Sequence, residues 1–279
     1  MLPVAIALVS CSAENITEST IPAENLLTLQ RVETYQPSKE VYDNGGNPNQ
    51  FTNKTIQYFE DGLIVADSTF NNVHHLESVT VRTATATSAS QITYNRDNIA
   101  IYTALFTYDG TGRIIELSVS SLSINYRETI AYTATGSATV TYHNTANGSS
   151  EVMGTFVPNE DGLLTSFNAE NENQHLVFEG GKPVTFNQRT MGSSTVINME
   201  YYDVPVPANR LKTVTQVNNV TLTGALVQSV AENSGYYFKS LEGIYNHSHT
   251  FNNLNYIEHS IKYDLINHGT TETFYYYNE

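Results

Sequence analysis

Tryptophan is absent from this chain and cysteine occurs once, directly after an apolar run from Leu2 to Ser10 that is too short to span a bilayer. A single thiol cannot form an internal disulfide. Basic residues are also scarce, 13 Lys and Arg against 28 Asp and Glu, which gives a formal net charge of −15. Because nucleic-acid binding depends on phosphate neutralisation by basic side chains, this balance argues against nucleic acid as a partner. It also disfavours electrostatic adhesion to anionic lipid heads.

The abundant residues are those of β structure. The 279 residues include 19 Tyr and 11 Phe, and Thr, Val and Asn are frequent. Thr, Tyr, Phe and Val favour the pleated, half-buried surface of a sheet, while Asn and Gly adopt the positive φ that tight turns require. A hydrophobic fraction of 40% is enough for a core. The composition therefore predicts an all-β protein made of many hairpins.

Apolar and polar residues alternate with period two along much of the chain, which is typical of strands with one buried face. Clear examples are residues 79–85, 114–119, 138–142 and 213–217. The best helix candidate is Pro22 to Val32, although a strand from Leu27 to Tyr35 fits equally well. Pro205 and Pro207 cannot both lie inside a central strand, so a bend is expected near residues 204–209.

Acidic-glycine turns framed by aromatic and aliphatic residues recur along the chain. Gly62, Gly112 and Gly162 lie about fifty residues apart, each following an aromatic residue and preceding an aliphatic strand. The aromatic residue before each turn can pack across to the aliphatic residue after it. This spacing predicts successive hairpins that reverse at these glycines.

The segment from Tyr108 to Ile114, with Tyr108-Asp109 followed by Gly112-Arg113, resembles the tyrosine-aspartate (Rhs-type) repeat. Similar degenerate repeats occur in uncharacterised Gram-negative, Bacteroidetes-type lipoproteins, and residues 201–209 resemble the late tyrosine-aspartate-proline segment of that group. The resemblance covers residues 27–279 and makes residues 274–277 the closing strand. We therefore expect one large, twisted antiparallel sheet of hairpin repeats that can curl into a half-barrel, with at most one short helix near the N-terminus.

The residues Leu8-Val9-Ser10-Cys11 resemble the lipobox of bacterial lipoproteins, in which the cysteine is lipidated. The resemblance implies a signal peptide at residues 1–10, a polar tether at 11–25, and one β domain at 26–279. It also implies that Cys11 carries the lipid (palmitate) and anchors the protein to a membrane. Ser12 is not the Asp that marks inner-membrane retention, so the expected location is the outer membrane, with the leaflet left open.

Few residues offer metal-binding chemistry. His247 and His249 share one face of a strand, and His259 and His268 follow, but no matching cysteine or carboxylate accompanies them. We interpret these histidines as surface or turn residues, as with His74 and His75. The oxygen-rich segment at residues 43–49 lacks the closing Glu of a calcium loop and is interpreted as a turn-rich loop. The sequence predicts neither a metal site nor a cofactor.

Catalytic motifs are equally few. The chain has no Gly-x-Ser-x-Gly elbow, and Gly110-Thr111-Gly112 lacks the third glycine of a dinucleotide loop. The Asn-x-Ser/Thr triplets at Asn53, Asn147, Asn219 and Asn246 are explained by composition. We therefore expect a monomeric, non-enzymatic binding or structural module of the cell envelope, whose partner beyond the membrane is a glycan or an envelope protein. The alternatives are a glycan-binding surface lipoprotein, which the missing Trp disfavours, a half-barrel lipid carrier, and an envelope hydrolase.

Overall fold

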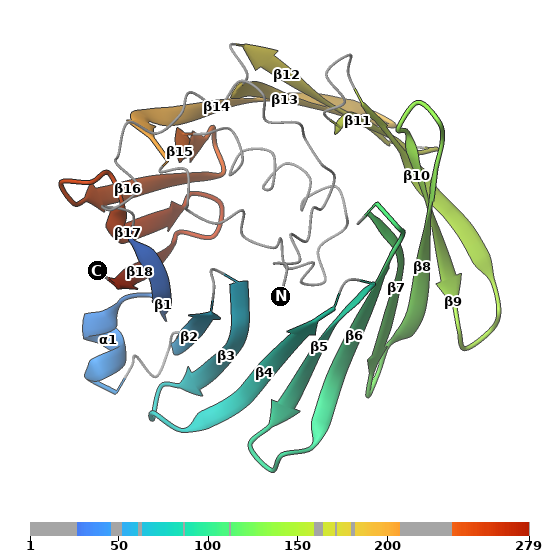
Figure 1. Ribbon diagram of the computed structural model, residues 1–279. Helices are drawn as coiled ribbons and strands as arrows, with labels where there is room; N and C mark the ends of the chain where they lie inside the picture. Colours follow the sequence, from blue (N-terminus) through green and yellow to red (C-terminus); the bar gives the residue numbers. More distant parts are fainter. Residues whose placement is uncertain are drawn as a thin grey trace.

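The computed structural model describes residues 27–45, 52–60, 63–85, 87–111, 113–158, 164–170, 172–179, 182–206 and 236–278. These residues form strands and one short helix, arranged as a ring (Figure 1). Within them, no helix is long and apolar enough to cross a membrane. The elements are β1 (Thr28–Gln36), α1 (Lys39–Asp43), β2 (Asn53–Glu60), β3 (Leu63–Asn71), β4 (Leu76–Ala84), β5 (Ser88–Asn95), β6 (Ala100–Tyr108), β7 (Ile114–Ser121), β8 (Asn125–Tyr132), β9 (Ala138–Asn144), β10 (Ser150–Pro158), β11 (Leu164–Asn168), β12 (Glu172–Glu179), β13 (Lys182–Thr190), β14 (Ser193–Pro205), β15 (Tyr236–Leu241), β16 (Tyr245–Phe251), β17 (Ile257–Asp264) and β18 (Gly269–Asn278).

The sheet is an antiparallel meander that closes on itself. Each strand pairs with the next along the chain, and β1 pairs with both β2 and β18. At the closing seam Val32 lies opposite Tyr275 and Thr34 lies opposite Thr273. The all-β antiparallel prediction is confirmed, but the half-barrel is wrong, because the first and last of the 18 strands in the described residues join and remove both edges of the sheet.

The N-terminal segment resolves the choice between helix and strand in favour of the strand. β1 covers residues 28–36 and carries alternating buried and exposed residues, and its β-branched and aromatic side chains suit a strand. The five-residue helix α1 follows a cis peptide bond between Gln36 and Pro37. The side chain of Ser38 caps this helix by accepting a hydrogen bond from the backbone N–H of Val41 at 3.3 Å. Among the described residues, helix content is thus as low as the sequence predicts.

The alternating segments at 79–85, 114–119 and 138–142 lie in or overlap β4, β7 and β9, as predicted. The segment at 213–217 lies outside the described residues, as do Gly62, Gly112 and Gly162. The strands that flank each of these three glycines in the chain are antiparallel partners. Near the expected bend, Val204 and Pro205 end β14, and residues 207–209 lie outside the described part.

Asparagine closes several hairpins by one common arrangement. Asn71, Asn95 and Asn252 each accept hydrogen bonds at Oδ1 from the backbone N–H groups two and four residues later, at 2.9–3.1 Å. The residue three positions after each asparagine has a positive φ between 59° and 65°. This is the geometry of a type I turn followed by a left-handed residue, a common three-residue hairpin loop. The high asparagine content therefore has a direct structural role in reversing the chain.

The turn that carries the tyrosine-aspartate motif uses the same arrangement with a carboxylate. Asp109 Oδ1 accepts from the backbone N–H groups of Thr111 and Arg113, at 2.9 and 3.0 Å, and Oδ2 accepts from Arg113 Nε at 2.8 Å. Hydrogen bonds from Thr111 and then Arg113 hold the pKa of Asp109 well below its usual range. The Arg113 guanidinium lies 4.2 Å from the centre of the Tyr132 ring. The motif residues thus clasp one turn, while membership of the repeat family stays a prediction.

The two faces of the wall are distinguished by α1, which lies outside the ring in Figure 1. Tyr42 of α1 packs edge-on against Tyr35 at 5.6 Å between ring centres, so Tyr35 faces the exterior. Because side chains alternate along a strand, Val32 and Thr34 face the interior. Residues that pair across neighbouring strands share a face, so the same assignment extends from β1 to every other strand. Nearly all buried strand residues belong to the interior face.

Candidate functional site

The interior face changes character around the ring. Along β6–β14 it is mainly apolar and buried, with the residues Ala104, Leu117, Val119, Val140, Phe156, Phe167, Leu176, Phe186, Ile197 and Met199. Polar side chains interrupt this region at Glu128, Gln174 and Gln188. Along β2–β5 the same face is mostly polar, with Thr55, Gln57, Asp67, Thr69, Ser78, Thr80, Arg82, Gln91 and Thr93. The exceptions are Phe59 and Ile64 at one end of β2 and β3, which are buried with Leu29 and Val32 of β1. We call these two regions the apolar wall and the polar wall.

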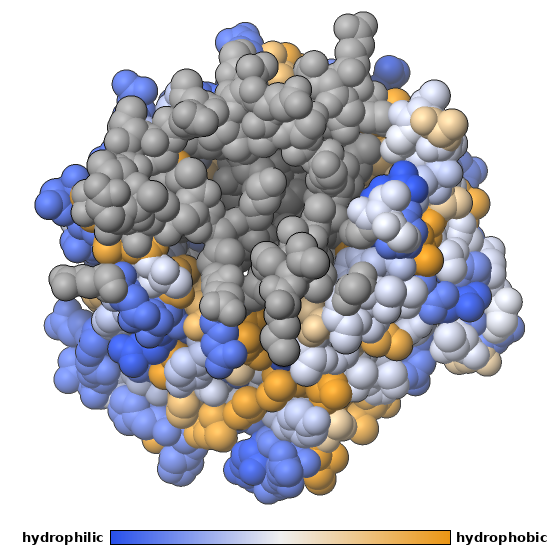
Figure 2. Space-filling model, viewed as in Figure 1, coloured by the Kyte–Doolittle hydropathy of each residue, from blue (hydrophilic) through white to orange (hydrophobic). Residues whose placement is uncertain are grey.

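The exterior face shows the opposite distribution. Over β2–β6 it carries Ile56, Tyr58, Phe70, Val79, Val81, Ile92, Tyr94, Ile101 and Leu105. In Figure 2 hydrophobic residues gather at the lower rim, where β3–β6 lie in Figure 1. Over β7–β13 the exterior carries Glu116, Ser118, Arg127, Thr129, Thr139, Thr141, His143, Asn173, His175, Asn187 and Arg189. The apolar exterior band typical of membrane-spanning barrels is therefore formed by only part of the described wall.

An ion pair occupies the polar wall. Arg82 Nη2 lies 2.5 Å from Asp67 Oδ2, and each side chain exposes only 14% of its surface. Within the described part of the chain, Arg82 Nε and Nη1 are buried and have no hydrogen-bond partner. A guanidinium has five N–H donors, and leaving buried donors unpaired is costly. Asp67 thus balances the charge of Arg82 but occupies only one of its nitrogens.

The polar wall meets the apolar wall between β5 and β6. Gln91 lies directly opposite Arg82 on one side and Ala104 on the other. Ala104 in turn lies opposite Val119, and these two residues form a buried cluster with Leu117. A charged group and a buried apolar cluster are therefore neighbours on the interior face.

A carboxyl group also lies within the apolar wall. Glu128 faces the interior, opposite Leu117 on β7 and Tyr142 on β9. Burial raises the pKa of this carboxyl above its usual value. Glu128 therefore favours the neutral, protonated form more strongly than an exposed glutamate does.

His247 and His249 lie on the interior face of β16 within a cluster of aromatic rings, so their interpretation as surface or turn residues is wrong. The two imidazole centres are 5.2 Å apart, and rings from β14–β16 surround them, namely Tyr202, Tyr237, Phe238, Tyr245 and Phe251. Burial, followed by the nearby charges of His249 and Lys262, lowers the pKa of His247 to about 3. His247 is therefore neutral at physiological pH.

Side chains in this cluster replace missing backbone pairs. β15 and β16 pair at only two positions, Ser240 with Asn246 and Leu241 with Tyr245. Beyond them, the Tyr202 hydroxyl donates to the His247 carbonyl at 2.8 Å and accepts from the His249 N–H at 3.3 Å. His249 Nε2 contacts the Phe238 carbonyl at 2.9 Å. The cluster therefore has a structural role in closing the wall where the ladder is short.

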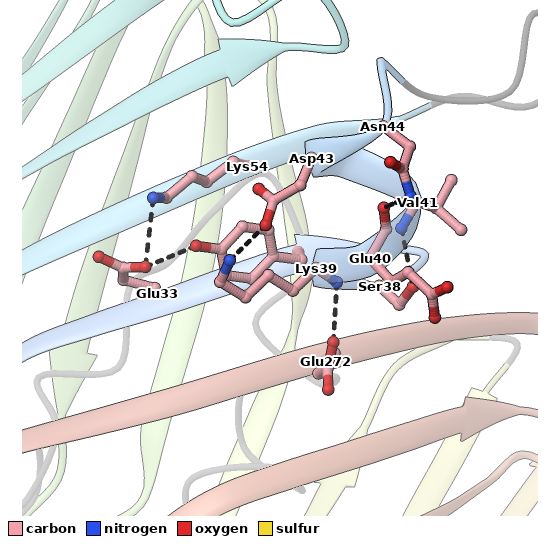
Figure 3. Close-up of polar contacts among 10 residues, drawn as sticks. Glu33, Ser38, Lys39, Glu40, Val41, Asp43, Asn44, Lys54 and Glu272 are labelled. Atoms are coloured by element: carbon pink, nitrogen blue, oxygen red, sulfur yellow. Dashed lines mark hydrogen bonds and ion pairs between the residues drawn. The ribbon is translucent and has the colours of Figure 1, made fainter.

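A second polar cluster lies on the exterior at the closing seam, shown in Figure 3. Glu33 Oε2 accepts a hydrogen bond from the Tyr35 hydroxyl at 2.6 Å and lies 3.2 Å from Lys54 Nζ on β2. Burial alone would raise the pKa of Glu33, but the hydrogen bonds from Tyr35 and Lys54 and the positive charges nearby lower it below its usual value. The buried carboxylate thus joins β1 to β2.

The same seam is joined to α1 and β17 through Glu272 of β18. Glu272 Oε2 accepts from the backbone N–H of Lys39 at 2.7 Å, and Oε1 lies 2.8 Å from His259 Nε2. Lys39 also forms an ion pair with Asp43 on the next turn of the helix. The polar groups at the seam therefore have a structural role, because their contacts hold the ring closed.

The other residues singled out in the sequence are dispersed. His268 occupies the β17–β18 turn with φ of 52°, and His74 and His75 lie in the β3–β4 turn. Asn53, Asn147 and Asn246 lie on β2, in the β9–β10 turn and on β16. Cys11, Asn219 and most of the segment at 43–49 lie outside the described residues, although Asp43 ends α1. Among the residues that are described, no group of three or more His, Cys, Asp or Glu side chains could hold a metal ion.

The sequence reading missed Arg82, Asp67 and Tyr202. Arg82 and Asp67 lie on the same face of two neighbouring strands. The alternation of side chains along a strand separates its two faces but does not show which face is the interior one. The one available signal was their charge, because charged residues are few and these two interrupt runs of Thr, Ser and Val.

No protein-family model matches this chain, and no curated protein matches it either. Among solved structures, the chain is similar to the crystal structure of a porin-like protein from Bacteroides uniformis ATCC 8492. The sequence identity is 9%, the similarity covers 90% of this chain and 98% of that one, and the TM-score is 0.47.

Proposed function

We propose that this protein is a non-enzymatic binding protein of the bacterial cell envelope whose barrel holds an amphipathic, lipid-like molecule on its interior face. The observation that carries the proposal is the division of that face into an apolar wall on β6–β14 and a polar wall on β2–β5. An amphipathic ligand matches this division, because its hydrocarbon gains from apolar burial and its head group needs hydrogen-bonding partners.

The arrangement of the polar residues supports a binding role over a catalytic one. Asp109, Glu33 and Glu272 are engaged in turns or at the seam, and the His247–His249 pair stabilises the wall. Arg82 is a buried, charged interior group whose donors exceed its partners among the described residues. This fits the lipid-carrier alternative from the sequence, with a closed barrel in place of the half-barrel.

The proposed location at the outer membrane depends on the lipobox-like motif Leu8-Val9-Ser10-Cys11. A lipidated Cys11 would hold the barrel at the outer membrane, as a monomer beside other envelope components. Replacing Cys11 with Ala should release the full-length protein from the membrane fraction and abolish labelling by an alkyne palmitate analogue. A Cys11→Ala protein that stays in the membrane, together with an unlabelled wild type, would overturn the anchor.

The interior ligand is tested with a tryptophan reporter, because the chain has no tryptophan of its own. Phe106 and Leu105 are consecutive residues of β6 that face opposite sides. Phe106 lies opposite Leu117 on the interior, whereas Leu105 is 44% exposed on the exterior. Phe106→Trp and Leu105→Trp therefore place one fluorophore on each side of the same strand.

Dibromostearate, a fatty acid with heavy-atom quenchers on its chain, is titrated into each variant without detergent. The proposal predicts saturable quenching of Phe106→Trp at a stoichiometry near one, with Leu105→Trp unchanged. Quenching of Leu105→Trp alone would place the lipid on the exterior over β2–β6 and would contradict the proposal. Absence of quenching in both variants would contradict it as well.

A further inference from the structure

We infer that Arg82 binds an anionic group, a carboxylate or a phosphate, at the head of an amphipathic ligand that lies along the apolar wall. The inference rests on the proposed function and assigns its head-group site. Three features of the described residues support it: the donors of Arg82, its polar surroundings, and the distance to the apolar wall.

The donors of Arg82 are suited to an anionic acceptor. Nη2 is engaged by Asp67, while Nε and Nη1 are buried without a partner in the described chain. A guanidinium recognises carboxylate and phosphate oxygens through parallel N–H···O bonds, and such charge-assisted bonds are strong in a buried position. Nε–H and the N–H groups of Nη1 point from different edges of the guanidinium, so an anionic oxygen at either edge would satisfy one nitrogen that Asp67 leaves without a partner.

The surroundings of Arg82 supply neutral hydrogen-bonding groups. Gln91 stands opposite it on β5, with an amide that can both donate and accept. One step along the same face, Thr80 Oγ1 and Thr93 Oγ1 are 2.9 Å apart and bond each other. Asp67 is the carboxylate paired with Arg82, and its single contact leaves two buried guanidinium nitrogens without a partner among the described residues.

The apolar wall begins next to this group. Arg82, Gln91, Ala104 and Val119 form one row across β4–β7, each opposite the next. Neighbouring strands are about 4.8 Å apart, so Val119 lies about 14 Å from Arg82 along the wall. A hydrocarbon chain attached to an anion at Arg82 would therefore reach the buried cluster of Ala104, Leu117 and Val119 within its own length.

The test uses the Phe106→Trp reporter in the full-length chain with two quenchers, dibromostearate and its uncharged methyl ester. Arg82→Gln should raise the half-saturation concentration of the acid about tenfold or more and leave that of the ester unchanged. Arg189→Gln, which removes an exposed exterior charge on β13, is the matched control and should change neither.

Arg82→Gln leaves the Asp67 carboxylate unpaired, which can prevent folding. A second variant keeps the test decisive in that case. Asp67→Asn retains the guanidinium and removes its competing carboxylate, so it should tighten binding of the acid and not of the ester. Inorganic phosphate and acetate, added as competitors, distinguish a site for the free anion from one that needs the attached chain. Competition at micromolar concentration by either anion alone would show that the chain is dispensable and would overturn the amphiphile assignment.

Failure of the two proposals can be told apart. If neither acid nor ester quenches Phe106→Trp, the interior binding function is wrong. If both quench it and neither Arg82→Gln nor Asp67→Asn changes the ratio of their affinities, the barrel binds lipid and the head-group site at Arg82 is wrong.

Discussion

Gly154 offers the sharpest test of the packing inside the wall. It is a buried residue of β10 next to a bulge at residues 152–154. A Cβ added at this position would lie 2.4 Å from Phe167 Cζ and 2.7 Å from the carbonyl oxygen of Asn168. Gly154→Ala should therefore destabilise the protein strongly, although alanine is the smallest replacement available.

The magnitude follows from the neighbours of Gly154. Carbon atoms pack at about 3.5–4.0 Å, so the Phe167 ring must retreat by more than about 1 Å. That ring is buried at 4.8 Å from the Phe156 ring, in a cluster with Ala138 and Val140, and has little room to move. Overpacking of this kind costs about 1–3 kcal/mol, and the clash with the backbone oxygen of Asn168 places Gly154→Ala near the upper end.

The assay is equilibrium urea unfolding followed by far-ultraviolet circular dichroism. Gly110→Ala and Gly192→Ala are matched controls, because a Cβ at either position meets nothing within 4 Å. Both controls should stay within about 0.5 kcal/mol of the wild type. A Gly154→Ala protein as stable as the controls would refute the packing of β10 against β11.

Three further predictions concern titrating groups and turns. Burial raises the pKa of Glu128 above 4.5, so the folded state holds this proton more tightly than the unfolded state and loses stability as the pH rises above 4.5. The urea midpoint of Glu128→Gln should therefore match that of the wild type at pH 4 and exceed it at pH 8. Because the pKa of His247 falls from 6.5 to about 3, stability that is present above pH 6.5 is lost on acidification, by up to about 1.4 kcal/mol per pH unit. His247→Phe should flatten the dependence of unfolding free energy on pH in this range, and an unchanged dependence would show that another group causes it. Asn95→Ala should cost about 1 kcal/mol by removing the acceptor of two turn hydrogen bonds, and a free energy of unfolding equal to that of the wild type would contradict this role of Asn95.

The sequence predicted the local structure better than the closure of the barrel. Period-two alternation and turn residues identified strands such as β4, β7 and β9, because these signals arise from residues close together in the chain. Closure depends on β1 pairing with β18, and Thr34 and Thr273 are separated by 239 positions. The predicted half-barrel failed for that reason, since no local pattern records whether the two end strands meet.

The candidate site was less accessible to sequence analysis. Alternation separates two faces of a strand but does not say which face points inward, so the polar interior of β2–β5 and the apolar interior of β6–β14 could not be assigned. The turn chemistry was partly missed as well. Acidic-glycine turns were predicted, whereas Asn71 and Asn95 act through a side-chain oxygen that accepts from the N–H groups two and four residues later. The role of Cys11 stays a prediction.

An interior binding face requires a closed wall, and a single cross-link tests that closure most directly. Thr34 and Thr273 are opposite one another at the seam, and their Oγ1 atoms are 3.4 Å apart on the interior face. In a Cys11→Ala background, Thr34→Cys/Thr273→Cys should oxidise to an intramolecular disulfide, seen as a mobility shift on a non-reducing gel. The pair Thr34→Cys/Thr270→Cys, on opposite faces, should stay reduced. A first pair that stays reduced in the folded protein would contradict the closed barrel and the interior binding face with it.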